Sequence, residues 1–517
     1  VRTRIFASLS AIVVHGALFD SPVWGPPHKR ECLDGTRETI LGEIKTVLQA
    51  SNSTLVWLSG SPGTGKSAIA HTIARHLKSE SRLAGTFFFS RKHKDMPDMA
   101  SLDFFAATLA YQISKWKNLA KDPLVQAIRS DPAILDPRKP LDDQIQELLI
   151  KPLENLEASW GRSEPKVLVI DAVDACEEDR IYELISCLST LLHQPRIPRL
   201  HIVITGCPLR TIDDAFAATG CKESIHHIAL DNIDVAEIHK DCRLFFKNAL
   251  ERSYRNHGFE SGPEDNTICR LADRANGRFG TASTIMRFLD TRHDEEDDFY
   301  EKLDVMKDPG NAHLHSTIFR LYEFIINSSE NPSRAYRHLS TVANLAEPLA
   351  IFHLRKLLGC LESDFLSILA SLSPIVSVPV DDSRVVEVLH IDSLRTFLSR
   401  HVPHTPQLLA RSSLRIMNES FLHQSCFKDV LQRMMKQVPE TASEQNLHSS
   451  SALEHACQYW SLYLSQAPMV MDGRLRTFLR NFWRGKLLSW FERQWYVGGL
   501  ESCIAILDIA QTIDFIE

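Results

Sequence analysis

The sequence predicts an α/β protein in which a doubly wound parallel sheet is followed by a helical domain, a winged-helix domain and a C-terminal helical region. Short apolar runs alternate with helical patterns between residues 54 and 230, as in parallel sheets covered by helices on both faces. The first run leads into a G-x-x-x-x-G-K-S loop and then a helix. Beyond residue 230, helical patterns replace nearly all strands. Together these features indicate a P-loop NTPase fold.

Length and composition fit a globular chain of roughly two to four domains. Its 517 residues are 44% hydrophobic and 24% charged. The net charge of -7 supplies no basic footprint, so we expect no nucleic-acid partner. The 11 cysteines form neither a C-x-x-C pair nor a zinc-type cluster with histidines. This usage favours reduced thiols in a cytoplasmic protein.

Residues 1–50 are predicted to be a lead-in segment with one helix, Arg37–Gln49. The apolar stretch from Ile5 to Phe19 is interrupted by polar residues and falls short of the ~20 residues that cross a bilayer, so no membrane span is expected. Because the chain begins with valine, we expect upstream sequence to be missing.

The nucleotide-binding domain is predicted over residues 51–230. Its strands are expected at Thr54–Leu58, Thr86–Phe89, Val167–Ile170, His201–Thr205 and His226–Leu230. A helical domain over 231–305 ends in an acidic segment, Asp290–Asp304, that resembles a solvated linker.

Two further regions follow. A winged-helix domain is predicted over 306–400, because helices precede a hairpin formed by Ile375–Val380 and Val385–Leu389. The C-terminal region, 401–517, is predicted to be helical, with Leu453, Cys457, Trp460 and Leu464 on one face.

The loop after the first strand carries the strongest chemical signal. It reads Gly60-Ser61-Pro62-Gly63-Thr64-Gly65-Lys66-Ser67, followed by Ala68. Glycines allow amides to face a phosphate chain, and the helix N-terminus favours negative charge. Lys66 is the predicted partner of the β- and γ-phosphates, and Ser67 a ligand of Mg²⁺. A glycine-rich turn that binds nothing is the alternative, which the flanking strand and helix disfavour.

Asp171 ends the apolar run Val167–Ile170 and is the predicted second contributor to the Mg²⁺ site. A buried parallel strand delivers such a carboxylate to the carboxyl edge of the sheet, where ligands bind. The alternative is that Asp171 only caps the following turn.

The run Asp171-Ala172-Val173-Asp174-Ala175-Cys176 resembles the Walker B segment of fungal NACHT proteins, which are signal-transduction ATPases with numerous domains (STAND). That resemblance implies an acidic pair where this chain has Asp174 and Ala175. Asp174, or second to it Glu177, is then the candidate catalytic base beside Lys66. Slow ATP hydrolysis and no hydrolysis both stay open.

Other segments extend the resemblance. They are Cys32–Arg37, Phe87–Arg91 and Ala275–Phe279. Similar proteins commonly carry an arginine that senses the γ-phosphate where this chain has Cys207, and Arg210 is a nearby substitute. His390, in a Leu-His-Ile-Asp run, is similar to a histidine that contacts the β-phosphate of ADP; a core or capping histidine is the alternative.

The resemblance implies an ATP/ADP-dependent switch between a closed monomer and a self-associated signalling state, with unidentified effector and sensor partners. Fungal nonself recognition or regulated cell death, a form of innate immunity, is the implied setting. The first rival is a nucleotide-binding scaffold without turnover. A small-molecule kinase would need an arginine-rich lid segment and a GTPase would need an Asn-Lys-x-Asp motif, and this chain has neither. A hairpin that binds DNA would need basic residues at its tip, whereas this one offers two aspartates and one arginine.

Overall fold

The computed structural model describes most of the chain. The described residues are 2–25, 30–50, 52–91, 97–115, 121–154, 165–219, 224–259, 262–290, 296–307, 316–359, 362–379, 383–388, 391–421, 451–468 and 472–511. They form two compact units that divide between Met286 and Arg287. The predicted boundaries at 230, 305 and 400 stay predictions.

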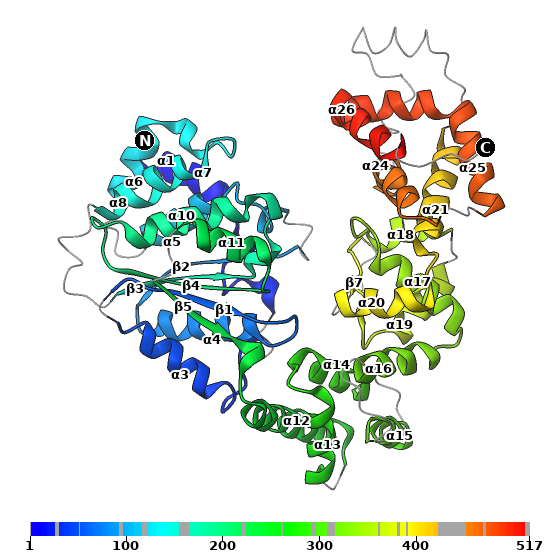
Figure 1. Ribbon diagram of the computed structural model, residues 1–517, viewed down its shortest axis with the longest axis horizontal. Helices are drawn as coiled ribbons and strands as arrows, with labels where there is room; N and C mark the ends of the chain where they lie inside the picture. Colours follow the sequence, from blue (N-terminus) through cyan, green and yellow to red (C-terminus); the bar gives the residue numbers. More distant parts are fainter. Residues whose placement is uncertain are drawn as a thin grey trace. The chain divides into compact units, whose positions relative to one another are not determined.

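The first unit contains a five-stranded parallel sheet within its described residues (Figure 1). The strands are β1 (Leu55–Ser59), β2 (Leu83–Phe88), β3 (Lys166–Asp171), β4 (Leu200–Gly206) and β5 (Ile225–Ala229). Their order is β2-β3-β4-β1-β5, and every neighbouring pair is parallel. The predicted parallel sheet is therefore confirmed, with strand bounds shifted by a few residues.

Helices cover both faces of this sheet (Figure 1). One face carries α3 (Glu38–Val47) and α4 (Lys66–Ser79), and the other carries α5 (Phe105–Lys115), α10 (Ile181–His193) and α11 (Arg210–Ala218). Successive side chains of β1 alternate between the two cores, because strand side chains point to opposite faces. Leu55 and Trp57 join one core, and Val56 and Leu58 join the other. The doubly wound arrangement follows directly from this alternation.

The N-terminal segment contributes to both cores of the first unit, and the prediction of a single helix there is wrong. Besides α3, it forms α1 (Arg2–Ala11), η1 (His15–Ala17) and η2 (Pro22–Trp24). The Phe19 amide donates to Thr86 Oγ1 at 3.2 Å, which fastens the segment to β2. The apolar residues Leu9, Val13 and Phe19 of the stretch from Ile5 to Phe19 are thus core residues of the α/β unit.

Further helices complete the first unit. They are α6 (Lys121–Ser130), α7 (Leu141–Ile145), α8 (Lys151–Glu154), α12 (Val235–His257), α13 (Asp265–Ala275) and the first part of α14 (Phe279–Leu289). Asp234 caps α12 by accepting from the Ala236 amide, and Gly258 ends that helix in a left-handed conformation. The predicted change to helices after residue 230 is confirmed.

The second unit is mainly helical. Its helices are α15 (Glu296–Lys307), α16 (Ser316–Asn327), α17 (Pro332–Ala343), α18 (Ile351–Leu358), α19 (Glu362–Ser371), α20 (Ile391–His401), α21 (Thr405–Ser420), α24 (Ser451–Ser465), α25 (Gly473–Gly485) and α26 (Leu487–Gln511). The antiparallel strands β6 (Val376–Ser377) and β7 (Glu387–Val388) form a short hairpin at the predicted place. The winged-helix assignment itself stays a prediction.

The acidic segment predicted as a linker contains α15, which buries Phe299, Leu303 and Met306 and is therefore a packed helix from Glu296 onward. Among the helices of the described residues, none is both long and apolar enough to cross a membrane.

Candidate functional site

The G-x-x-x-x-G-K-S loop joins β1 to α4 at the carboxyl edge of the sheet. Gly63 and Gly65 have φ angles of +81° and +95°, a region that residues with a Cβ rarely adopt. Gly65 is also the N-cap of α4. The two glycines therefore turn the chain directly into a helix whose first amides and dipole favour an anion.

Lys66 folds back over this loop. Its ammonium donates to the carbonyl oxygens of Gly60 and Ser61, at 2.7 and 3.0 Å. It also lies 3.7 Å from Cys207 Sγ. The ammonium thus sits across the concave side of the loop, held by neutral acceptors that an anionic ligand would outcompete.

A carboxylate from another strand anchors the start of the loop. Asp231 follows β5, and its Oδ2 accepts from the Ser61 amide at 2.8 Å and from the Ser61 hydroxyl at 3.1 Å. The Thr64 hydroxyl donates to the Ser61 carbonyl at 2.8 Å. Sequence reasoning missed Asp231, although an acid directly after a strand at this edge was a usable signal.

Asp171 and Ser67 meet beside the loop, as predicted for a Mg²⁺ site. Asp171 is 2% exposed, and its carboxylate accepts from Thr205 Oγ1 at 2.5 Å and from the Ser67 hydroxyl. Burial raises the pKa of Asp171 to about 6, against the lowering effect of these two hydrogen bonds. A hydroxyl and a carboxylate side by side are oxygen ligands that suit Mg²⁺.

Asp174 lies in the same cluster. It belongs to η6 (Val173–Ala175), and its Oδ1 would be 3.0 Å from a Cβ placed on Gly206, so the glycine makes room for it. The Cys207 thiol hydrogen-bonds to Asp174 and to Lys66. Burial raises the pKa of Cys207 to about 11, which keeps the thiol neutral. The structure therefore brings Lys66, Asp171, Asp174 and Cys207 together.

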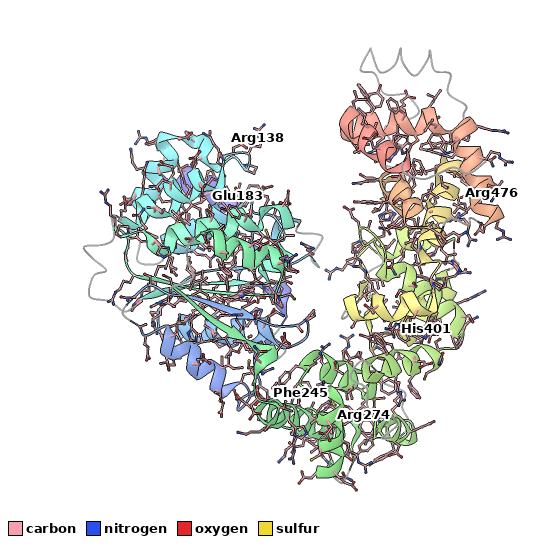
Figure 2. The ribbon with its side chains drawn as sticks, in the orientation of Figure 1. Arg138, Glu183, Phe245, Arg274, His401 and Arg476 are labelled. Carbon is pink, nitrogen blue, oxygen red and sulfur yellow. The ribbon has the colours of Figure 1, made fainter. Side chains whose placement is uncertain are left out.

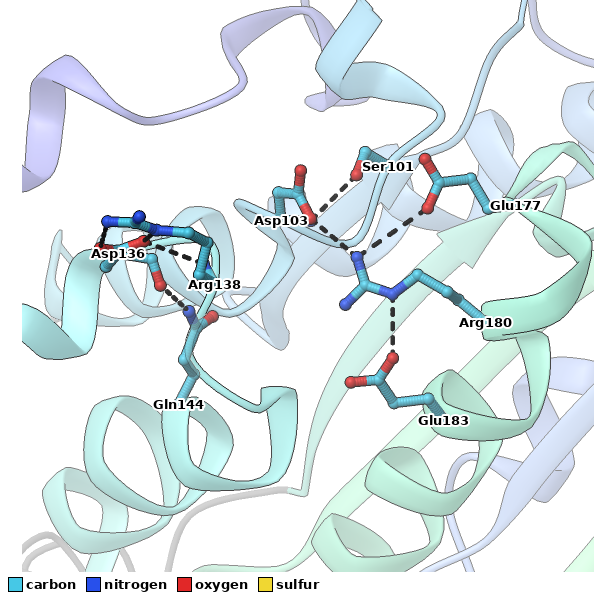
Figure 3. Close-up of polar contacts among 8 residues, drawn as sticks. All are labelled: Ser101, Asp103, Asp136, Arg138, Gln144, Glu177, Arg180 and Glu183. Carbon is cyan, nitrogen blue, oxygen red and sulfur yellow. Dashed lines mark hydrogen bonds and ion pairs between the residues drawn. The ribbon is translucent and has the colours of Figure 1, made fainter. Parts of the chain in front are cut away.

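Glu177, the second candidate base, belongs to a different cluster (Figure 3). Its carboxylate lies 3.9 Å from Arg180 Nη1, which also contacts Asp103 at 2.7 Å. Arg180 Nε contacts Glu183 at 2.9 Å. Glu177 is thus one of three acids around the half-buried Arg180, whereas Asp174 and the lysine of the loop both contact Cys207.

Two predicted residues remain, Arg210 and His390. Arg210 is the exposed first residue of α11, next to the site in sequence. His390 lies outside the described residues, which resume at Ile391 in α20.

Arg91, from a segment that resembled the family, supports the Asp174 segment. It donates from Nε to the Ala175 carbonyl at 2.9 Å and from Nη2 to the Cys176 carbonyl at 2.5 Å. These bonds hold the turn that follows Asp171. Sequence spacing gave no signal for this pairing, because the partners are more than eighty residues apart.

A parallel α/β sheet with a G-x-x-x-x-G-K-S loop between a strand and a helix, and a buried acid on a nearby strand, defines a P-loop protein. The family described as "Nephrocystin 3, N-terminal" matches residues 35–206, which include the loop and the strands from β1 to β4. No curated protein matches this chain.

Several solved structures are similar at low identity. A Signal Transduction ATPase with Numerous Domains (STAND) that has a tetratricopeptide repeat sensor, from Pyrococcus horikoshii, aligns at 12% identity and a TM-score of 0.40 over 94% of this chain and 60% of that one. The Walker-type ATPase of Pyrococcus abyssi aligns at 15% identity and a TM-score of 0.35, over 70% and 95% of the two chains. Cdc6p from Pyrobaculum aerophilum aligns at 15% identity and a TM-score of 0.32, over 75% of this chain and 99% of that one. This chain thus spans about three-fifths of the P. horikoshii protein.

Proposed function

We propose that this chain binds ATP and ADP with Mg²⁺ and acts as a nucleotide-dependent regulatory switch of the STAND type. The observation that carries the proposal is the convergence of the loop ammonium, the Ser67 hydroxyl and the Asp171 carboxylate at the end of β1 and β3. A polyphosphate needs a cation, inward amides and a metal-binding oxygen pair at one place, and these residues supply them.

Phosphate binding would exchange the contacts of Lys66. Its ammonium would leave the carbonyls of Gly60 and Ser61 for the β- and γ-phosphate oxygens, since bonds between two charged groups are about twice as strong as those to neutral acceptors. Mg²⁺, when bound, would supply positive charge that offsets the charge of the phosphates. Ser67 and Asp171 would hold that ion, and ionisation of Asp171 beside it would be favoured.

Regulation would arise from the difference between the diphosphate and triphosphate states. We place ADP between the loop and the predicted winged-helix region, with His390 as its partner there, in a closed monomer. Exchange for ATP would remove this bridge and allow self-association. A differential affinity of ~5.5 kcal/mol moves such an equilibrium from 1:99 to 99:1. The family resemblance favours a cytoplasmic role in fungal nonself recognition or regulated cell death.

The test is nucleotide identification in freshly purified protein. The wild type is denatured and its released nucleotide is separated by chromatography, in parallel with Lys66→Ala. Lys45→Ala is the matched control, because Lys45 is an exposed lysine of α3. We expect ADP in the wild type and the control, and none in Lys66→Ala. An empty wild type that also fails to bind ADP or ATP in calorimetry would refute the proposal.

A scaffold that binds nucleotide without cleaving it is the second candidate. It is favoured by Ala175 and Cys207, which occupy the positions of the second acid and the arginine in similar proteins. Single-turnover assays with labelled ATP separate the two candidates. Hydrolysis that disappears in Asp174→Asn would exclude the scaffold, while intact ATP after prolonged incubation would support it.

A further inference from the structure

The outer face of the phosphate loop is held by two segments that come from distant parts of the chain. A loop that turns its amides toward a ligand turns carbonyls outward, and these need donors of their own. The Gly63 carbonyl accepts from the Gly280 amide at 2.9 Å. The next carbonyl, of Thr64, accepts from Arg37 Nη2 at 2.9 Å. The loop is therefore bonded to the start of α14 and to the residue before α3.

Arg37 connects the loop with α12 and α14. Its guanidinium lies 5.0 Å from the centre of the Phe279 ring at the start of α14. Its amide donates to Asp241 Oδ2, on α12, at 3.0 Å. Phe245 of α12, labelled in Figure 2, packs edge-on against Phe279 with ring centres 5.8 Å apart. One residue thus contacts the loop and both helices.

The turn before Phe279 makes the contact with α12 rigid. Asn276 and Gly277 both have positive φ, at 46° and 74°. A Cβ on Gly277 would lie 2.5 Å from Ile238 Cγ2 of α12, which leaves space for glycine alone. The turn that leads to Phe279 and Gly280 is therefore packed directly against α12.

Arg37 is held in an unusual and incompletely bonded state. It is 3% exposed and has a left-handed backbone with φ of 58°. Its Nε and Nη1 atoms are buried without a hydrogen-bond partner, and Nε lies 3.9 Å from Asp241. Buried charged donors that lack acceptors are costly, so an arrangement with more bonds competes with this one. A residue that served only to stabilise the fold would gain from full pairing.

We infer that Arg37 is a positioning residue that couples phosphate binding inside the loop to the packing of α12 and α14 outside it. The inference rests on the proposed function and adds the route by which the loop communicates with the helices after the sheet. Closing the loop around phosphate fixes the Thr64 carbonyl, and Arg37 transmits that constraint to Asp241 and Phe279. Because coupling is reciprocal, the packing of α12 and α14 also sets the affinity of the loop.

The experiment uses the full chain and two readouts, nucleotide affinity by calorimetry and amide hydrogen exchange with and without ADP. The variants are Arg37→Gln and the milder Phe279→Leu. Arg138→Gln is the matched control, because Arg138 is 88% exposed and paired only locally with Asp136 (Figure 3). In the wild type and the control, ADP should protect amides of the loop and of residues 279–286 and 235–245.

In Arg37→Gln we expect affinity to fall by roughly tenfold, within the usual range of coupling effects. Protection of the loop should persist at saturating ADP, while the added protection of α12 and α14 disappears. Phe279→Leu should lose part of the added protection of α12 and α14. If Arg37→Gln does not fold, Phe279→Leu alone tests the coupling. A wild type that does not bind nucleotide overturns the proposed function. A wild type that binds, with helix protection unchanged in the variants, overturns the coupling alone.

Discussion

The two halves of the candidate site differ in completeness. On the binding side, the glycines, Lys66, Ser67 and Asp171 all match the pattern of a phosphate loop and lie together. On the cleavage side, the family resemblance implies an acid and an arginine at the positions that Ala175 and Cys207 occupy. The halves meet where Lys66 lies 3.7 Å from Cys207 Sγ. We therefore expect that the proposed nucleotide binding and any hydrolysis can be altered separately.

The chemistry of Cys207 shows what the cleavage side lacks. With a pKa raised to about 11, its thiol is neutral and donates to Asp174, whereas an arginine would be a cation that stabilises charge on the γ-phosphate. A base whose lone pairs accept from a thiol is also less available to a water molecule. Under the proposed function, both features would favour a long-lived ATP state, as a switch requires.

Introducing the acid and the arginine that the family resemblance implies should have the largest effect on ATP cleavage. We expect Ala175→Glu combined with Cys207→Arg to raise the single-turnover rate of ATP cleavage by roughly 10²-fold, since general bases contribute 10²–10⁴ and a positioned arginine adds to this. The affinity for ADP should stay within about threefold, which calorimetry checks. An unchanged rate at unchanged affinity would mean that the two positions do not limit hydrolysis.

Removing the proposed Mg²⁺-binding carboxylate of Asp171 should have the next largest effect. Asp171→Asn keeps the bond from Thr205 but removes the charge that would hold Mg²⁺. We expect Mg²⁺ to strengthen ATP binding to the wild type by about tenfold or more, and to have little effect on the variant. Titrations with Mg²⁺ and with EDTA measure this difference. Asp213→Asn, at an exposed position of α11, is the control and should behave as the wild type.

The sequence predicted the parts of the site that depend on local pattern. Buried parallel strands appear as continuous apolar runs, so the strands were placed within a few residues, and the loop has a motif that needs no tertiary information. The contacts of Arg37 and Arg91 could not be predicted, because they join segments brought together only by the fold. Asp231 was missed although its position directly after a strand was a usable signal. Glu177 shows the converse: its proximity to Asp171 in sequence suggested a role, but an ion cluster with Arg180 holds it elsewhere.

Gly206 leaves the space that Asp174 occupies, so a substitution there tests whether the binding and cleavage halves are separable. A Cβ there would lie 2.9 Å from Val173 Cγ2 and 3.0 Å from Asp174 Oδ1. Gly206→Ala should therefore displace Asp174 and cost about 1–3 kcal/mol of stability through overpacking. Any hydrolysis should slow severalfold, while ADP affinity changes little. Thermal melting, calorimetry and single-turnover assays give the three values, and a loss of ADP affinity equal to the loss of hydrolysis would show that the halves are not separable.

The smallest expected effect concerns the stability of the binding half. His71, on α4, is 3% exposed and packs on Phe88 with ring centres 4.5 Å apart; burial, with Arg30 nearby, lowers its pKa to about 4. An unfolded chain binds this proton near pH 6.5, so the stability that His71 contributes is complete above that pH and is lost as pH falls toward 4. From pH 7.5 to 6 the loss is about 0.8 kcal/mol. We expect His71→Gln to remove this pH dependence from the opening of α4 amides in hydrogen exchange, while the exposed His193→Gln retains it. Equal slopes in all three proteins would show that α4 does not hold a neutral histidine.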